Sequence, residues 1–142
     1  MTRKNLGRPG LSGLGDSGDL EMVRRMPSFL YGLVNKTGIH RHMVHELMCL
    51  DEMQRLVGEE TEKSFIELVF NQFSDPEIVL ICDDSFLMKG FAPTCKTSRG
   101  IVLHGQVIIA RLVLAETETE IQNLTEDQYQ TVIDELLEYV IP

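Results

Sequence analysis

The stretch from Glu77 to Leu114, EIVLICDDSFLMKGFAPTCKTSRGIVLHGQVIIARLVL, decides the fold. It holds two runs dominated by Ile, Val and Leu, at Ile78–Cys82 and Ile101–Leu114, separated by a polar loop. Apolar runs that end at turn residues are typical of strands buried on both faces. We therefore predict that these two runs form the centre of a sheet.

Length and composition indicate one soluble globular domain. The chain has 142 residues, 43% of them hydrophobic and 25% charged, and no apolar run approaches the roughly 18 residues that a membrane span needs. We expect a cytoplasmic protein. Its three cysteines, Cys49, Cys82 and Cys95, are an odd number without CxxC spacing, which argues against a disulfide framework or a zinc knuckle. We expect reduced thiols, with Cys82 buried.

The charge is unevenly distributed. The net charge is −9, and residues 1–25 hold five basic and three acidic side chains, so the remaining 117 residues carry −11. So acidic a body repels the phosphate backbone of nucleic acids. We predict no direct nucleic-acid binding by the acidic body. Acidity is also a common means of staying soluble.

The chain divides into a tail and a body. Residues 1–26 are rich in glycine, and we predict a flexible tail because so little apolar surface cannot support a fold. Residues 27–142 form the predicted domain. In it, Ser28–Val34 and Ile39–Glu46 flank the turn Asn35–Gly38 and predict a β-hairpin.

The second strand of this hairpin carries two histidines, His40 and His42, on one face. They are weak zinc candidates if His104, Cys49 or Asp51 supplies a third ligand. The alternative is that they lie on the solvent face of an edge strand. An unpaired edge also makes a homodimer plausible. No cofactor is predicted.

Helical spacing predicts two helices. Cys49–Gly58 has apolar residues at helical intervals and a glycine stop, and Ser64–Phe70 then predicts another strand. Thr125 and Gln128 form a predicted capping box at the start of the last helix. Its apolar stripe comprises Tyr129, Val132, Ile133, Leu136, Leu137 and Val140. We predict an α+β fold in the order β-β-α-β-β-β-α, with a mainly antiparallel sheet of about five strands and two helices packed on it.

The loop between the two central strands is the candidate binding site. We expect the strand Ile78–Cys82 to end at Asp83 and Asp84, and a brief extended piece at Phe86–Met88. Gly105 predicts either a bulge, which would re-aim His104, or a close approach of the backbone. The predicted ligand or partner residues are Lys89, Gly90, Phe91, Pro93, Thr94 and His104.

The order of four motifs resembles an uncharacterised family of small α+β proteins from bacteria, phages and mobile elements. The motifs are Leu56-Val57-Gly58, Lys89-Gly90-Phe91-Ala92-Pro93-Thr94, His104-Gly105-Gln106 and Leu124-Thr125-Glu126-Asp127-Gln128. The family has a GLPPN-like loop, where this chain has Ala92 for the first Pro and Thr94 for the Asn, and an LTDEQ-like helix start. The similarity covers about Phe29 to Tyr139. It implies an architecture and a phage or mobile-element setting within a bacterial cell, and no chemistry.

Three kinds of function fit these observations. We favour a non-enzymatic protein of phage or mobile-element origin that binds a host protein through its acidic surface, as a counter-defence or regulatory inhibitor would. A self-encoded protein is the other expected kind of partner. The alternative is a small-ligand-binding protein for a nucleotide or metabolite. An enzyme using Asp84, Lys89, Cys95 and His104 is less favoured, because neighbouring residues on a strand, such as Asp83 and Asp84, point to opposite faces.

Overall fold

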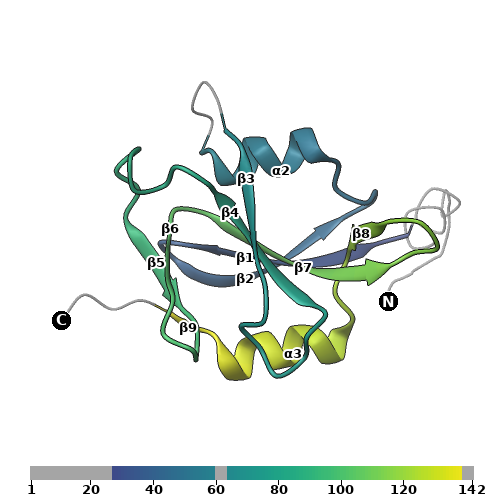
Figure 1. Ribbon diagram of the computed structural model, residues 1–142. Coiled ribbons are helices and arrows are strands. Elements are labelled where there is room, and N and C mark those ends of the chain that lie inside the picture. The colour runs from purple at the N-terminus through teal and green to yellow at the C-terminus, as the bar shows by residue number, and fades with distance from the viewer. Residues whose placement is uncertain (1–26, 60–63, 139–142) are drawn as a thin grey trace, which may run out of the picture.

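The computed structural model describes residues 27–59 and 64–138, so the predicted tail lies outside the described residues. The described part is α+β, with two helices and nine strands in two antiparallel sheets (Figure 1). The strands are β1 (Phe29–Asn35), β2 (Gly38–Val44), β3 (Ile66–Val69), β4 (Ile78–Asp83), β5 (Pro93–Lys96), β6 (Val102–His104), β7 (Val107–Leu114), β8 (Thr119–Gln122) and β9 (Leu137–Glu138). The helices are α2 (Leu50–Val57) and α3 (Glu126–Glu135).

The larger sheet has the order β2-β1-β7-β4-β3, with β8 added to β7. The two apolar runs of the sequence pair at its centre, where β4 lies antiparallel to β7 and Leu80 is opposite Ile109. The smaller sheet has the order β6-β5-β9. The prediction that the two runs form the middle of a sheet is confirmed.

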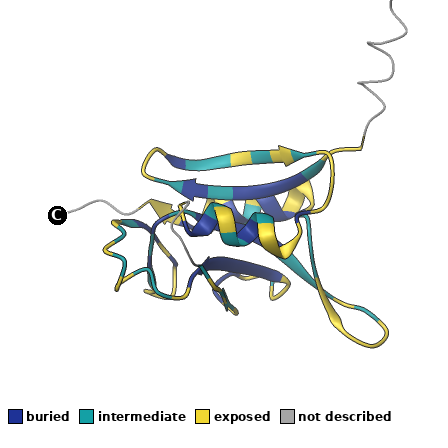
Figure 2. Cartoon of the chain, turned by 90° about the horizontal axis from the view of Figure 1, so that it is seen from above, coloured by how far each residue is buried: buried dark blue, intermediate teal, exposed yellow. Residues whose placement is uncertain are grey.

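Each face of the larger sheet has its own core. On one face Val79, Ile81 and Ile108 pack with Met53 and Val57 of α2. On the other, residues of the sheet pack with α3 and the smaller sheet; this cluster includes Leu80, Cys82, Ile109, Cys95, Leu103 and Val132. Figure 1 shows α2 and α3 on opposite sides of the strands, and Figure 2 shows the outward side of α2 exposed.

Several local predictions are confirmed. The hairpin forms across Asn35–Gly38, where Gly38 has φ 115°. The capping box forms as predicted: Gln128 N donates to Thr125 Oγ1, and Thr125 N donates to Gln128 Oε1. Cys82 is buried, and all three cysteines are free thiols. In the described residues no helix is long and apolar enough to cross a membrane.

The predicted number of strands was too small: Ile101–Leu114 is two strands, and three short strands, β5, β8 and β9, were not predicted. Gly105, with φ 77°, interrupts the run, so β6 joins the smaller sheet and β7 the larger one. The break is larger than the predicted bulge. Beyond it, the acidic connection Ala115–Asn123 contains β8, and the loop before Ile101 contains β5. Local patterns missed β5 (PTCK) and β8 (TEIQ) because neither contains a run of apolar residues. Strand β9 has only two residues and lies in the predicted last helix.

Two further boundaries differ from the prediction. Phe86–Met88 is not extended: Lys89 N donates to Ser85 O and Phe91 N donates to Phe86 O, so the chain turns tightly there. Helix α3 ends at Glu135, so Leu137 lies in β9 and is exposed, and Ile133 is also exposed. Among the described residues of the predicted apolar stripe, Tyr129, Val132 and Leu136 are therefore the ones that are buried.

Strand β2 is an edge of the larger sheet, as predicted for the second strand of the hairpin. Arg41 on this strand donates two hydrogen bonds to Glu126, at 3.0 and 2.6 Å, and thereby ties β2 to the start of α3. The homodimer stays a prediction.

Replacing Gly105 by alanine should destabilise the protein more than replacing Gly90. Both glycines have positive φ, 77° and 75°, which costs an alanine about 1–2 kcal/mol. A Cβ at Gly105 would lie 2.6 Å from Phe91 Cδ2, whereas a Cβ at Gly90 meets nothing within 4 Å. We expect Gly105→Ala to lose about 1–3 kcal/mol more than Gly90→Ala, the usual cost of overpacking. Urea unfolding of both variants measures this, and equal losses would contradict the tight contact.

Candidate functional site

A groove of about 580 Å³ opens beside the loop that the sequence singled out. Four separate segments form it: the β1–β2 turn, the carboxyl end of α2, the Gly90–Thr94 loop and the β6–β7 junction. A volume of 300–1,000 Å³ is usual for small-molecule sites. This groove is the candidate functional site.

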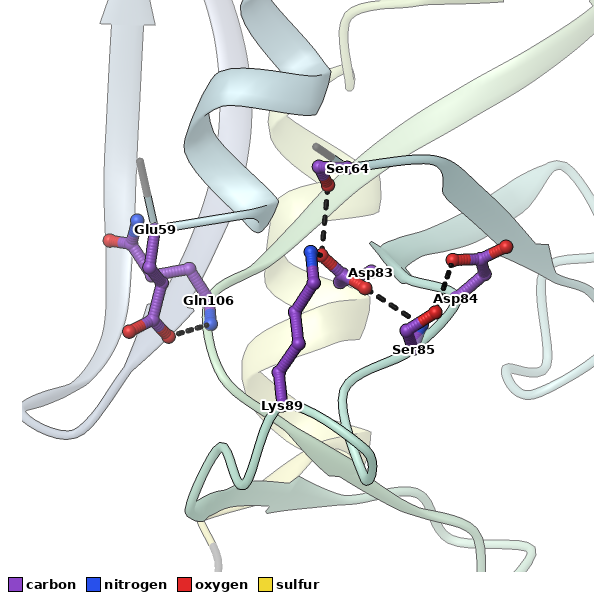
Figure 3. A network of polar contacts seen from close by, with 7 residues as sticks. All are labelled: Glu59, Ser64, Asp83, Asp84, Ser85, Lys89 and Gln106. Carbon is purple, nitrogen blue, oxygen red and sulfur yellow. Dashed lines mark hydrogen bonds and ion pairs between the residues drawn. The ribbon is translucent and has the colours of Figure 1, made fainter. Parts of the chain in front are cut away.

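The loop is held in place by the last residue of β4. Asp83 is buried, and its carboxylate accepts hydrogen bonds from Lys89 Nζ at 2.6 Å, Ser64 Oγ at 2.9 Å and Ser85 N at 2.7 Å (Figure 3). Burial raises the pKa of this carboxyl, but the hydrogen bonds from Lys89, Ser85 and Ser64 outweigh it and bring the pKa below its ordinary value. Asp83 is therefore an ionised anchor for the loop.

Close packing at Gly105 joins the loop to α2. The Phe91 ring and the Glu59 carboxylate both lie where a Cβ of residue 105 would be. Glu59 Oε2 accepts from Gln106 N at 3.0 Å (Figure 3). Gln106 Nε2 donates to Leu56 O at 2.7 Å. These contacts fix one wall of the groove and depend on glycine at position 105.

The structure brings three of the predicted binding residues, Gly90, Phe91 and Thr94, together in the groove. The Thr94 side chain is buried and donates to Gly105 O at 2.7 Å, so it positions the backbone of this wall. Phe91 is half-buried, and Gly90 is exposed.

The other three predicted binding residues lie beside the groove. Lys89 pairs with Asp83, and Pro93 is the first residue of β5. His104 stacks on Phe86, with ring centroids 4.8 Å apart, and its Nδ1 donates to Phe91 O at 2.8 Å. Lys89 and His104 thus hold the loop in place through Asp83, Phe86 and Phe91 and do not line the groove.

Sequence reasoning missed nine of the twelve residues that line the groove, Ala92, Gly105 and Gln106 among them. It predicted the β1–β2 turn and the end of α2 only as a turn and a helix terminus. No sequence pattern indicates that either of them lies near the loop. Six lining residues come from these two segments: Asn35, Lys36, Thr37, Arg55, Leu56 and Glu59.

The residues considered for catalysis do not form a reactive set. Burial raises the pKa of the Cys95 thiol to about 11, so it is protonated at neutral pH. On the paired strands β5 and β6, Cys95 is opposite Leu103, and the Nδ1 of His104 is already bonded to a carbonyl. Asp84 is exposed, and its carboxylate accepts from Ser85 Oγ.

The histidines of β2 also lack the surroundings of a zinc site. Among residues 27–59 and 64–138 no three His, Cys, Asp or Glu side chains are gathered so as to hold a metal ion. His40 contacts Thr37 Oγ1 at 2.6 Å instead.

Comparisons with known protein families, with curated proteins and with solved structures gave no match. The resemblance to an uncharacterised family therefore stays a prediction, and function is argued from the groove alone.

Replacing Asp83 by asparagine should lower stability by about 1–3 kcal/mol at neutral pH, because Lys89 and its neighbours lose a charged acceptor. The folded-state pKa of Asp83 lies below its unfolded value, so this stabilisation is present above about pH 4 and is lost as the pH falls through the folded value. Denaturant unfolding from pH 7 to acid should show the difference between wild type and Asp83→Asn shrinking.

The neighbouring substitution Asp84→Asn is the matched control, because Asp84 is exposed. It should change stability by less than about 0.5 kcal/mol. A gap between wild type and Asp83→Asn that persisted unchanged into strong acid would contradict the assigned role of the carboxylate.

Proposed function

We propose that this protein is a non-enzymatic small-ligand-binding protein and that the groove beside Gly90–Thr94 is its binding site. The observation that supports this most is that four separate segments of the chain, including the loop singled out from the sequence, line one groove of about 580 Å³. The proposal takes up the second of the functions weighed from the sequence.

The rigidity of the walls supports the same proposal. The loop is anchored by Asp83, and the β6–β7 junction is fixed to the end of α2 by the bonds of Glu59 and Gln106. A site that is largely formed before binding loses less conformational entropy on taking up its ligand. The buried Cys95 and the exposed Asp84 supply no activated nucleophile or base, which favours binding over catalysis.

A tryptophan placed in the groove should block binding. Ala92 is exposed and lines the groove, so Ala92→Trp fills it without disturbing the core. Screening a small-molecule fragment library against the ¹⁵N-labelled full chain should shift the amide signals of Gly90, Gly105 and Gln106, and Ala92→Trp should abolish these shifts.

Ser98→Trp is the control, since Ser98 is equally exposed and does not line the groove. It should leave the shifts unchanged. A library that shifts no groove signal, or shifts that survive Ala92→Trp, would overturn the proposal.

Binding of a basic host protein through the acidic surface is the second candidate. One observation favours it: the connection from β7 to β8 exposes Glu116 and Glu118, and Glu120 is exposed on β8 itself. These three glutamates define the acidic arm. Opposite charges across an interface accelerate and orient association.

Neutralising the acidic arm tests this candidate. A partner protein captured from the host and purified should bind wild type more weakly as salt is raised, because exposed charges are screened. The triple variant Glu116→Gln, Glu118→Gln and Glu120→Gln should bind it at least about tenfold more weakly, a change of about 1.4 kcal/mol. Salt-independent binding, or binding unaffected by the three substitutions, would contradict the acidic arm as the interface.

A further inference from the structure

The charge of the groove is opposite to that of the protein. The chain carries −9, yet the groove lining contains two cations, Lys36 and Arg55, and one carboxylate, Glu59. Lys36 lies in the β1–β2 turn and forms no ion pair with another described residue. Arg55 uses one terminal nitrogen on Glu52, at 2.9 Å, and its guanidinium has further N–H groups to donate. The two cations come from two different walls.

The groove lining also contains two side-chain amides, those of Asn35 and Gln106, each with one end that no described residue bonds. Asn35 Oδ1 accepts from Thr37 N and Thr37 Oγ1, which identifies Nδ2 as the outer end of that amide. Gln106 Nε2 donates to Leu56 O, which leaves its Oε1 as an acceptor. No described residue bonds either of these two outer atoms. A planar ring with both donor and acceptor atoms on its edge matches such a pair.

Phe91 adds an aromatic surface to the lining. Its ring is half-buried, with Gly105 packed against it and Lys89 Nζ over it at 5.9 Å from the ring centroid. Its neighbours in the lining, Gly90 and Ala92, have little or no side chain. Stacking of a planar base on an aromatic side chain contributes about 1–3 kcal/mol. The groove therefore combines a stacking surface, an amide pair and two cations.

We infer that the ligand of this groove is a mononucleotide, with its base on Phe91 between Asn35 and Gln106 and its phosphate near Lys36 and Arg55. This inference rests on the proposed small-ligand function and names the ligand class. It agrees with exclusion of nucleic acids by the acidic body, because one phosphate group meets only the local charge of the groove whereas a polymer meets the whole surface.

Three features of the site oppose an anion. Glu52 pairs with Arg55 at 2.9 Å and offsets part of its charge. The other two features are limited in their effect. The carboxyl end of α2 carries a partial negative charge, but Leu56 O already accepts from Glu59 N and Gln106 Nε2. Glu59 carries a full charge, and its Oε2 accepts from Gln106 N. A glutamine at position 59 keeps an oxygen for that bond and removes the charge, so Glu59→Gln should strengthen nucleotide binding.

Isothermal titration calorimetry of the full chain with AMP, GMP, CMP and UMP tests the inference. We expect at least one to bind about tenfold more tightly than its nucleoside or ribose 5-phosphate, a difference of about 1.4 kcal/mol. Lys36→Ala and Arg55→Ala should each weaken the nucleotide several-fold and leave the nucleoside unchanged. Lys96→Ala is the charge-matched control, since Lys96 is exposed on β5 outside the groove lining and should have no effect.

The outcomes separate the ligand class from the site. If no mononucleotide binds while other compounds shift the Gly90 and Gly105 signals, the ligand class is wrong and the groove remains a site. If no compound shifts these signals, both proposals fail. A nucleoside that binds as tightly as its nucleotide, or weaker nucleotide binding by Glu59→Gln, would also overturn the inference.

Discussion

The structure depends on burying the β4–β7 pair on both faces. Every residue of β4 is buried, so neither face of the central pair can be left to water. Helix α2 covers one face, and α3 together with the smaller sheet covers the other. The short elements of the chain are placed by this requirement, because each small strand or helix gains most of its stability from the apolar surface it covers.

Gly105 determines how the smaller sheet is attached. The positive φ of Gly105 turns the chain between β6 and β7, so that the apolar run Ile101–Leu114 contributes one strand to each sheet. The absence of a side chain at Gly105 also lets Phe91 and Glu59 approach the junction. The groove thus lies where the two sheets separate, which explains why it is bordered by a hairpin turn, a helix end and a loop.

Charged groups around the groove have two different roles. Lys89 forms an ion pair with the buried Asp83 and so holds the loop in place; its charge is compensated within the protein. Lys36 and Arg55 lie on the groove lining and give this part of an acidic protein a locally basic character. A lysine found in a polar loop by sequence alone does not reveal which of these roles it has, since the difference depends on the distance to a buried carboxylate.

The sequence by itself determined the elements whose signals are local. The Ile, Val and Leu runs, the hairpin turn at Asn35–Gly38, and the capping box of Thr125 and Gln128 depend on residues a few positions apart, and all three are present. The loop residues Gly90, Phe91 and Thr94 were also found in this way. Only the tertiary structure decided that Ile101–Leu114 divides between two sheets and that Lys36, Arg55 and Glu59 complete the groove. Those features rest on contacts between residues far apart in the chain, about which short-range periodicity carries no information.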